Sequence, residues 1–309
     1  MTEFKIHEKL MGSAFELIVV CEKQSEADIF LQDGLAEISR IEQLLSEFKE
    51  DSVTTLLNNE AGKNAVKIPE EVYQLLQRCI HISQFTQGAF DITVGPLKKL
   101  YNFKNQDFTF PDYYQLQKTL PKVGFSRILL QNNHKVLLSQ KGMHLSFASI
   151  GKGYAADCVR KLWLKNGLQG GIINASGDLT VIGKRADLST WKVGIAHPDD
   201  PKKILAYIPA EKESVATSGD YEQFFIKDGI RYSHNINPKT GKPLTGIKSV
   251  SVVSPGAELS DALATAVYVM GVEVGIHFIN QLPETHCLIV DDQNKVFHSK
   301  NIIFEYANA

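Results

Sequence analysis

One stretch, residues 146–178, constrains the fold and the chemistry of this chain more than any other. A short glycine-bearing loop that carries Lys152 leads into a predicted helix over 154–166, and a predicted apolar strand over 171–174 follows it. Small residues let the backbone approach a ligand, the free amides of a helix start attract anions, and a lysine adds positive charge. The pattern is typical of an anion-binding joint, and ordinary loop–helix connections share it.

The composition indicates a globular protein. Of the 309 residues, 43% are hydrophobic and 22% are charged, which provides enough apolar material for a sizeable core. The formal net charge of −2 argues against nucleic acid or an anionic membrane as a partner. There is no apolar run of about 20 residues, and the first residues do not resemble a signal peptide, so we expect a cytoplasmic location. The four cysteines lack CxxC spacing, which predicts buried free thiols.

Apolar residues at three- and four-residue steps predict further helices. We expect these over 25–49, 70–86, 112–119, 259–270 (with Ser260 as the N-cap) and 273–281. Alternating or apolar runs predict strands over 4–7, 15–20, 128–130, 136–138, 179–182, 191–195, 204–208, 214–217, 221–226, 229–234, 249–253, 287–290 and 296–298. No repeat or linker interrupts the chain. We therefore expect one intertwined α+β unit over residues 1–309, with mixed or antiparallel sheets and flanking helices.

Two residues each allow two interpretations. Phe48 falls at the end of the first long predicted helix, where an aromatic ring either completes the core or faces a ligand. Asp91 lies between Phe90 and Ile92, and a carboxylate in so apolar a setting either stabilises a turn or points at a ligand. The sequence leaves both pairs of interpretations open.

Asp261 and Thr265 are candidates for a metal site. They are four residues apart on a predicted helix, so their oxygens share one face, with Cβ atoms about 5–6 Å apart. A carboxylate and a hydroxyl suit a hard cation such as Mg²⁺, which also keeps several waters and uses substrate phosphates as ligands. Alternatively, Asp261 only complements the dipole of the first helical turn, and Thr265 bonds within its own helix.

His234 is a candidate general base. It stands where a predicted hairpin meets the turn-rich segment 235–241, and a histidine titrates near neutral pH, as a base requires. The same position is also compatible with an inert surface residue. Before the hairpin, the small-residue turn 217–220 either donates amides to a ligand or only bends the chain.

Eight short motifs, in the same order along the chain, resemble those of the ApbE-type FAD:protein FMN transferase family. They are MGS at 11–13, LN at 57–58, GAFDITVGPL at 88–97, IGKGY at 150–154 with Asp157, NASGD at 174–178, VATSGDYE at 215–222, HNINPKTG at 234–241 and SDALAT at 260–265. The resemblance extends over nearly the whole chain, and the shared order makes it specific.

The resemblance implies an ApbE-like, T-fold-related domain that carries out a Mg²⁺-dependent reaction. The FMN moiety of FAD would move to a Thr or Ser hydroxyl of an acceptor flavoprotein, with release of AMP. The metal would bind Asp261, Thr265 and the main-chain carbonyl of Ser149, and His234 would take the hydroxyl proton. The residues implied around FAD are Met11, Phe48, Ala89, Phe90, Asp91, Ser146, Lys152 and Asn235.

Five residues depart from the pattern of the family, and two of them, Ala148 and Ser149, replace its loop glycines. Ser146 stands where the family usually has Asp, Asn237 replaces the Asp of its HIIDP motif, and Asn235 replaces an isoleucine that packs near the flavin. The lost carboxylate at Ser146 predicts weaker or altered recognition of FAD, which Ser146→Asp would restore. Two other functions are therefore open: a non-catalytic FAD-binding paralogue, and a Mg²⁺-dependent FAD pyrophosphatase that gives FMN and AMP.

Overall fold

The structure is a computed structural model that describes residues 1–101, 103, 109–220 and 223–307. Its helices are α1 (Gln24–Leu45), α2 (Val53–Asn59), α3 (Glu70–Phe85), α4 (Gly95–Lys98), α5 (Tyr113–Thr119), α6 (Gly151–Lys165), α7 (Ala257–Met270) and α8 (Val272–Ile279). Its strands are β1 (Thr2–Leu10), β2 (Ser13–Cys21), β3 (Val66–Lys67), β4 (Ile128–Gln131), β5 (Lys135–Leu138), β6 (Gly170–Ala175), β7 (Asp178–Gly183), β8 (Trp191–His197), β9 (Asp200–Ala210), β10 (Ser214–Gly219), β11 (Phe224–Lys227), β12 (Ile230–Ser233), β13 (Ile247–Ser254), β14 (His286–Asp291), β15 (Val296–His298) and β16 (Glu305–Tyr306).

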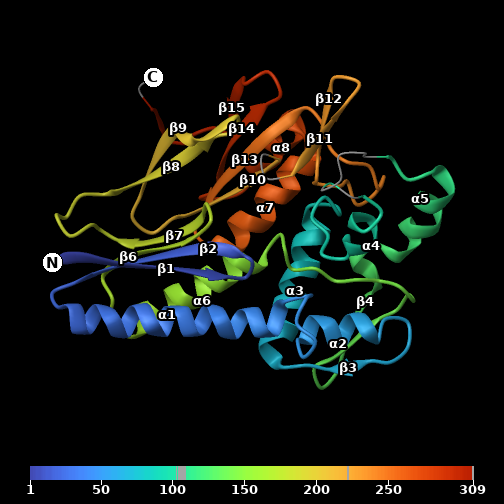
Figure 1. The fold of residues 1–309 in the computed structure, drawn as a ribbon, viewed down its shortest axis with the longest axis horizontal. Coiled ribbons are helices and arrows are strands. Elements are labelled where there is room, and N and C mark those ends of the chain that lie inside the picture. Colours follow the sequence, from blue (N-terminus) through green and yellow to red (C-terminus); the bar gives the residue numbers. More distant parts are fainter. Residues whose placement is uncertain (102, 104–108, 221–222, 308–309) are drawn as a thin grey trace.

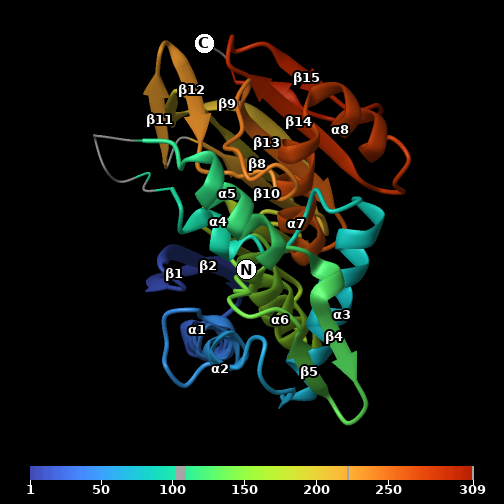
Figure 2. The ribbon, with the colours of Figure 1, turned by 90° about the vertical axis from the view of Figure 1, so that its right-hand side faces the viewer.

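An antiparallel sheet of eight strands forms the centre of the molecule, in the order β1-β2-β6-β7-β10-β13-β14-β15. Helices α1, α6 and α7 cover one face, and the small sheet of β8, β9 and β16 lies over the other (Figure 1). The turned view in Figure 2 shows α1 on the helical side of β1 and β2. The α+β class with antiparallel sheets and flanking helices is thus as predicted.

The alternation of side chains in β2 explains why the sheet is covered on both faces. Phe15, Leu17 and Val19 are fully buried and pack, on the helical side, with Ile38 of α1 and Trp163 of α6. Ile18 and Val20, which point the other way, pack in the core on the other side, which the small sheet completes. A strand that is apolar on both faces needs two covering layers, so the sheet sits in the middle of the fold.

The ends of three helices differ from the prediction. Helix α7 begins at Ala257 with Gly256 as its N-cap, so the prediction that Ser260 caps it is wrong. Helix α6 begins at Gly151, which places Lys152 in its first turn rather than in the preceding loop. Helix α1 ends at Leu45, several residues before the predicted end. The predicted cores of these helices are present.

The hairpin of β11 and β12 is confirmed, and its turn explains why. Asp228 and Gly229 have φ angles of 53° and 76°, the left-handed values that a two-residue hairpin turn requires. β11 and β12 pair only with each other among the described strands. The first two residues of the predicted strand 221–226 lie outside the described residues.

All four cysteines are free thiols. Cys21, Cys79 and Cys287 are buried as expected, whereas Cys158 is partly exposed. Across the described part of the chain, every helix is too short or too polar to cross a membrane.

Candidate active site

Two tight turns lie at the same end of the central sheet. The β1–β2 turn contains Met11, with φ of 51°, and its amide donates a hydrogen bond of 3.0 Å to Glu42 Oε1 of α1. The β6–β7 turn contains Ser176, with φ of 59°, and Asn174 Oδ1 closes it by accepting from the Gly177 amide at 2.9 Å. Because both turns lie at the sheet end where α6 and α7 begin, they form part of one cavity wall.

A cavity of about 610 Å³ lies at this end of the sheet. Its size is within the range of about 300–1,000 Å³ that is usual for cofactor and nucleotide pockets. The structure brings almost all predicted site residues to its wall: Met11, Phe48, Ala89, Asp91, Ser146, Ser149, Lys152, His234, Asn235, Asp261 and Thr265. Phe90 does not line the cavity, because its side chain is fully buried in the core around α3. Its ring therefore cannot touch a ligand there.

Helices α6 and α7 cap each other's N-termini at the cavity. The Asp157 carboxylate of α6 accepts hydrogen bonds from the amides of Ala257 and Glu258, at 3.0 and 2.8 Å. In return, Asp261 Oδ2 of α7 accepts one from the Gly153 amide of α6, at 3.1 Å. A Cβ on Gly153 would lie 2.2 Å from the Ala257 carbonyl oxygen, so only glycine permits this approach. The two helix starts are thereby locked together, and Asp261 is held in place.

Lys152 forms an ion pair with Asp178, the first residue of β7. The second Asp178 oxygen accepts a hydrogen bond from the Thr217 amide at 3.1 Å. At the start of α6, carboxylates therefore face both the lysine and the Gly153 amide, the two groups that the sequence pattern offers to an anion. Sequence reasoning missed Asp178 as a site residue. Its position after the Ser176–Gly177 turn was the available signal, but its partner is distant in the sequence.

The charges around Asp261 suit a metal ion. Asp261 and Asp178 are 5% and 3% exposed, and Lys152 is the cation that pairs with Asp178. Burial, together with the negative charge of Asp178, raises the pKa of Asp261 above its ordinary value, although Lys152 and the Gly153 amide oppose the rise. Two buried carboxylates beside one ammonium leave negative charge that a divalent cation would compensate.

The predicted metal ligands are compatible with Mg²⁺. Thr265 Oγ1 lies 3.1 Å from Ser218 Oγ, so its hydroxyl faces a neighbouring strand instead of bonding within its own helix. Asp261 is the fifth residue of α7 and bonds to α6, which argues against a role limited to the dipole of its own helix. With Ser149 on the same wall, the donors are a carboxylate, a hydroxyl and a carbonyl, all hard oxygen ligands.

His234 is oriented as a base would be. Its Nδ1 lies 3.0 Å from the Gln223 carbonyl oxygen, which can only accept, so Nδ1 carries the proton and Nε2 keeps its lone pair. Burial of the ring and the positive charge of Lys98 lower the pKa of His234 to about 4, although the Gln223 hydrogen bond opposes this. The imidazole is therefore neutral at pH 7. The ring also lines the cavity, as the interpretation as a base requires.

Glu47 supplies a carboxylate beside Ser146. The Ser146 hydroxyl donates to Glu47 Oε1 at 2.7 Å, and His144 Nε2 lies 2.7 Å from Glu47 Oε2. Burial acts to raise the pKa of Glu47, but these two hydrogen bonds and the charge of Lys98 outweigh it and lower the pKa. A negative charge thus stands next to the position where the sequence lacks the expected Asp. Sequence reasoning missed it, because Glu47 comes from the segment after α1.

The side chain of Asn237 stabilises a turn, and this role needs no charge. Asn237 Oδ1 accepts hydrogen bonds from the amides of Lys239 and Thr240, at 2.9 and 3.2 Å. This is the side-chain bonding of an Asx turn, which Asn and Asp support equally. The replacement of Asp by Asn at this position therefore preserves the turn beside the cavity. Asn235 lines the cavity itself, and its side-chain amide donates to Ser233 Oγ at 3.2 Å.

Exposure and hydrogen bonding bear on the interpretations of Phe48 and Asp91. Phe48 is 89% exposed and lines the cavity, so the core interpretation is wrong. The Asp91 carboxylate accepts from the amide and hydroxyl of Thr93, at 2.8 and 2.6 Å, and from the Phe125 amide at 2.9 Å. Asp91 therefore stabilises a turn, and it also lines the cavity.

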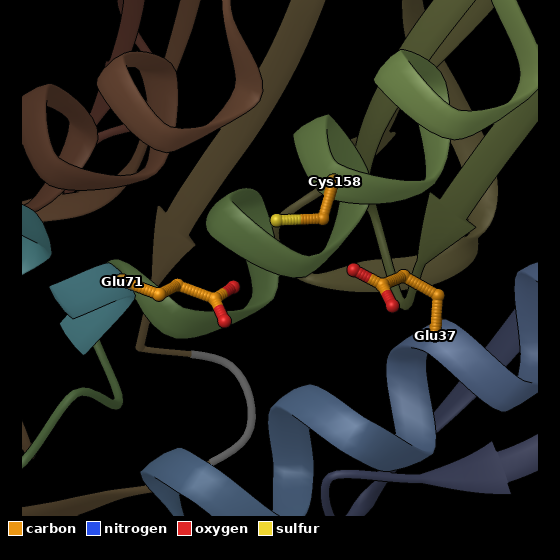
Figure 3. A group of neighbouring side chains, drawn as sticks. All are labelled: Glu37, Glu71 and Cys158. Atoms are coloured by element: carbon orange, nitrogen blue, oxygen red, sulfur yellow. The ribbon is translucent and has the colours of Figure 1, made fainter. Parts of the chain in front are cut away.

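A second group of polar side chains lies outside the cavity, where α1, α3 and α6 meet. Glu37, Glu71 and Cys158 approach one another from these three helices (Figure 3), with ligand atoms within 4.8 Å. Arg40 binds both carboxylates, at 2.8 Å from Glu37 and 2.7 Å from Glu71. Burial raises the pKa of Cys158 to about 12, so its thiol stays protonated. The group is a charge-paired helix junction rather than a metal site.

Comparison with known proteins gives a consistent match. A model of the ApbE family matches residues 11–289. An FAD:protein FMN transferase of Treponema pallidum (strain Nichols) is 30% identical, over 97% of this chain and 88% of that protein. One of Klebsiella pneumoniae (strain 342) is 29% identical, over 94% of this chain and 90% of that protein. Among solved structures, the ApbE protein from Thermotoga maritima has a TM-score of 0.87 and 29% identity, with 97% of each chain covered.

Proposed function

The chain belongs to the ApbE family and is a transferase, and we propose that it moves the FMN part of FAD onto a threonine or serine hydroxyl of an acceptor flavoprotein. The observation that carries the proposal is the meeting of two groups at one cavity. His234 offers a neutral Nε2, and Asp261 offers a buried carboxylate beside Thr265. A base and an oxygen-rich cation site are the parts that phosphoryl transfer needs.

His234 would act on the acceptor. With Nδ1–H held by Gln223, Nε2 accepts the proton of the incoming hydroxyl as its oxygen attacks the phosphorus of the FMN half. One P–O bond forms to the acceptor and the bond to the bridging oxygen of the pyrophosphate breaks. AMP leaves with that oxygen, and FMN remains on the protein as a phosphoester.

Asp261, Thr265 and the Ser149 carbonyl would hold Mg²⁺. When bound, the ion supplies Lewis-acid stabilisation of charge on the phosphate oxygens. Gly153 sets the position of Asp261, and Asp178 holds Lys152 at the start of α6. These contacts place the ligands before any substrate arrives, so little reorganisation is needed at the moment of reaction.

Glu47 supports a working FAD site over a purely vestigial one. Its hydrogen-bonded carboxylate places a negative charge next to Ser146 on the cavity wall, where the sequence lacks the Asp of the family pattern. Phe48, mostly exposed at the same wall, offers an aromatic face of the kind on which planar rings stack.

Covalent flavin transfer is the direct test. The purified protein is incubated with FAD, Mg²⁺ and an extract that contains flavoproteins, and the products are separated under denaturing conditions. We expect a fluorescent band whose mass has grown by one FMN less one water, together with one AMP per modified chain. The His234→Ala protein, treated in the same way, serves as the control.

The competing functions give different results in the same assay. AMP and free FMN without a fluorescent band, at the same rate with or without the extract, would establish the pyrophosphatase. Tight yellow co-purification of FAD with no AMP release would establish the non-catalytic binder. Either outcome contradicts the transferase.

A further inference from the structure

Lys98 is a cation on the cavity wall that the reaction as described does not use. It is the last residue of α4, whose preceding residues Gly95, Pro96 and Leu97 are buried, so the helix is anchored in the protein while Lys98 reaches the cavity. Within the described part of the chain, its ammonium makes no ion pair within 4.0 Å and no hydrogen bond.

The other two lysines of the cavity wall differ from it. Lys152 is paired with Asp178, and Lys49 lies 3.5 Å from Glu42. Glu47, whose negative charge acts on Lys98, has its own oxygens held by His144 and Ser146. Lys98 therefore faces the cavity with its charge uncompensated by a direct partner.

A buried ammonium without an ion-pair partner is unfavourable, and a bound anion would stabilise it. Burial lowers the pKa of Lys98, and the charge of Glu47 opposes this only in part. Lys98 is also the charge that acts on His234, so the two side chains lie in the same part of the cavity. An anionic ligand group that binds beside His234 would complete the missing interaction.

We propose that Lys98 binds the phosphate of the FMN half of FAD, the group at which His234 directs the acceptor hydroxyl. The inference rests on the proposed function. A base must lie within hydrogen-bond reach of the hydroxyl that attacks, and the attacked phosphorus is adjacent to that hydroxyl. A cation close to the base is thus on the side of the FMN phosphate. The metal ligands and Lys152 remain for the rest of the pyrophosphate.

The test compares ligands that differ only in this phosphate. Kd values for FMN and riboflavin are measured by flavin fluorescence in the same Mg²⁺-containing buffer, for the wild-type protein and for Lys98→Met. We expect FMN affinity to fall about tenfold or more, which is the usual loss for a charged hydrogen bond, while riboflavin affinity is unchanged. Affinity for AMP, which carries the other phosphate, should also stay the same.

Two variants act as controls. Lys98→Arg keeps the charge and should retain most of the preference for FMN over riboflavin. Lys99→Met removes the adjacent, exposed lysine, which contacts His144 at 3.3 Å and does not line the cavity, and it should change neither Kd. If Lys98→Met melts at a lower temperature than wild type, Lys98→Gln repeats the comparison with a polar side chain of similar length.

Equal losses of affinity for FMN and riboflavin would show that Lys98 contacts the flavin ring. Unchanged FMN affinity would show that Lys98 contacts neither the ring nor the phosphate. Both results overturn the inference. If the wild-type protein transfers FMN while Lys98→Met keeps the wild-type ratio of the two Kd values, only this inference fails. If the wild-type protein binds neither FAD nor FMN, the proposed function fails with it.

Discussion

The two sides of the cavity are built in different ways. The carboxylate wall, formed by Lys152, Asp178 and Asp261, comes from the starts of α6, β7 and α7, and each of these side chains makes an ion pair or a hydrogen bond to a backbone amide. The histidine wall, formed by Glu47, Lys98 and His234, comes from segments after α1, at the end of α4 and after β12. Here, Lys98 has no direct partner among the described residues.

This difference fits the two tasks that the proposed function gives to the walls. A cation site needs ligands fixed to a fraction of an ångström, which reciprocal capping between two helices provides. A site that accepts a hydroxyl of another protein must be open to that protein, and short connecting segments at the surface permit this. The contrast predicts that changes on the carboxylate wall abolish the reaction through the metal, whereas changes on the histidine wall alter its rate, its pH dependence or the affinity for one ligand group.

The largest effect is expected from Asp261→Ala. The change removes the buried carboxylate that we propose as a ligand of Mg²⁺. Because metal polarisation is worth several kcal/mol in the transition state, we expect AMP release to fall by about a thousandfold or more at any Mg²⁺ concentration. The measurement is AMP release from FAD across a Mg²⁺ titration. Glu273→Ala, on the exposed first turn of α8, is the control that should behave as wild type. Unchanged turnover of Asp261→Ala would rule out the metal assignment.

His234→Ala should slow the reaction by about 100-fold to 10,000-fold, the usual contribution of a positioned base. FAD affinity should change little, because Nε2 acts on the acceptor. The measurements are the transfer rate with saturating FAD and the Kd of FAD. An equal loss in both quantities would instead make His234 a binding residue. His298→Ala, in β15 and exposed, is the matched histidine control.

The pH profile sharpens the same prediction. With its pKa lowered to about 4, His234 is already neutral at pH 7 and stays so as the pH falls toward 5. The part of the rate that depends on its neutral form should therefore be flat from pH 7 to about 5 and decline only as the pH approaches 4. A midpoint near the ordinary histidine value of about 6.5 would show that the ring is not held in this environment.

Asp157→Ala is expected to destabilise the start of α7 and, with it, the position of Asp261 on the carboxylate wall. It removes the acceptor for the first amides of α7, at 2.8 and 3.0 Å, and such caps are worth about 0.5–2 kcal/mol in the free energy of unfolding. Urea denaturation measures that loss. Because α7 also carries Asp261, the rise in Tm caused by Mg²⁺ should shrink as well.

Asp112→Ala is the control that separates the loss of stability from the loss of the Mg²⁺-dependent rise in Tm. Asp112 caps α5 through the Gln115 amide at 2.7 Å, away from the carboxylate wall. The variant should lose a similar amount of stability and keep the full Mg²⁺-dependent rise in Tm. If both variants keep that rise, reciprocal capping does not position Asp261.

The smallest effect is expected from Ser146→Asp, and its sign is the opposite of the one that the sequence suggests. The structure places Ser146 Oγ 2.7 Å from a Glu47 oxygen, so a new carboxylate would face an existing one. We expect FAD affinity to fall by about threefold to tenfold instead of rising. In the Glu47→Gln background the same substitution should be harmless or favourable. Tighter FAD binding by the single variant would contradict the assigned role of Glu47.

Local patterns were sufficient to predict much of the fold. The apolar steps of α1, α3 and α7, and the Asp228–Gly229 turn, depend on side chains within a few residues of one another. The spacing of Asp261 and Thr265 likewise placed both on the cavity side of one helix. In each case the interaction that decides the structure lies within the segment itself.

Other features depended on partners that are distant in the sequence. Helix α7 starts at Ala257 instead of beside Ser260 because Asp157, 100 residues earlier, caps it. Phe48 faces the cavity because α1 ends at Leu45, and the ring is not covered.

Local periodicity predicts most of the secondary structure, and motifs in order indicate the family and a part of the cavity wall, because these depend on residues close together in the sequence. The fold decides which partners the polar side chains of that wall meet: Lys152 pairs with Asp178, the Ser146 hydroxyl donates to Glu47, and Lys98 has no direct partner among the described residues. The physical reason is that a charge is stabilised by whatever lies within a few ångströms of it, and folding chooses those neighbours from the whole chain.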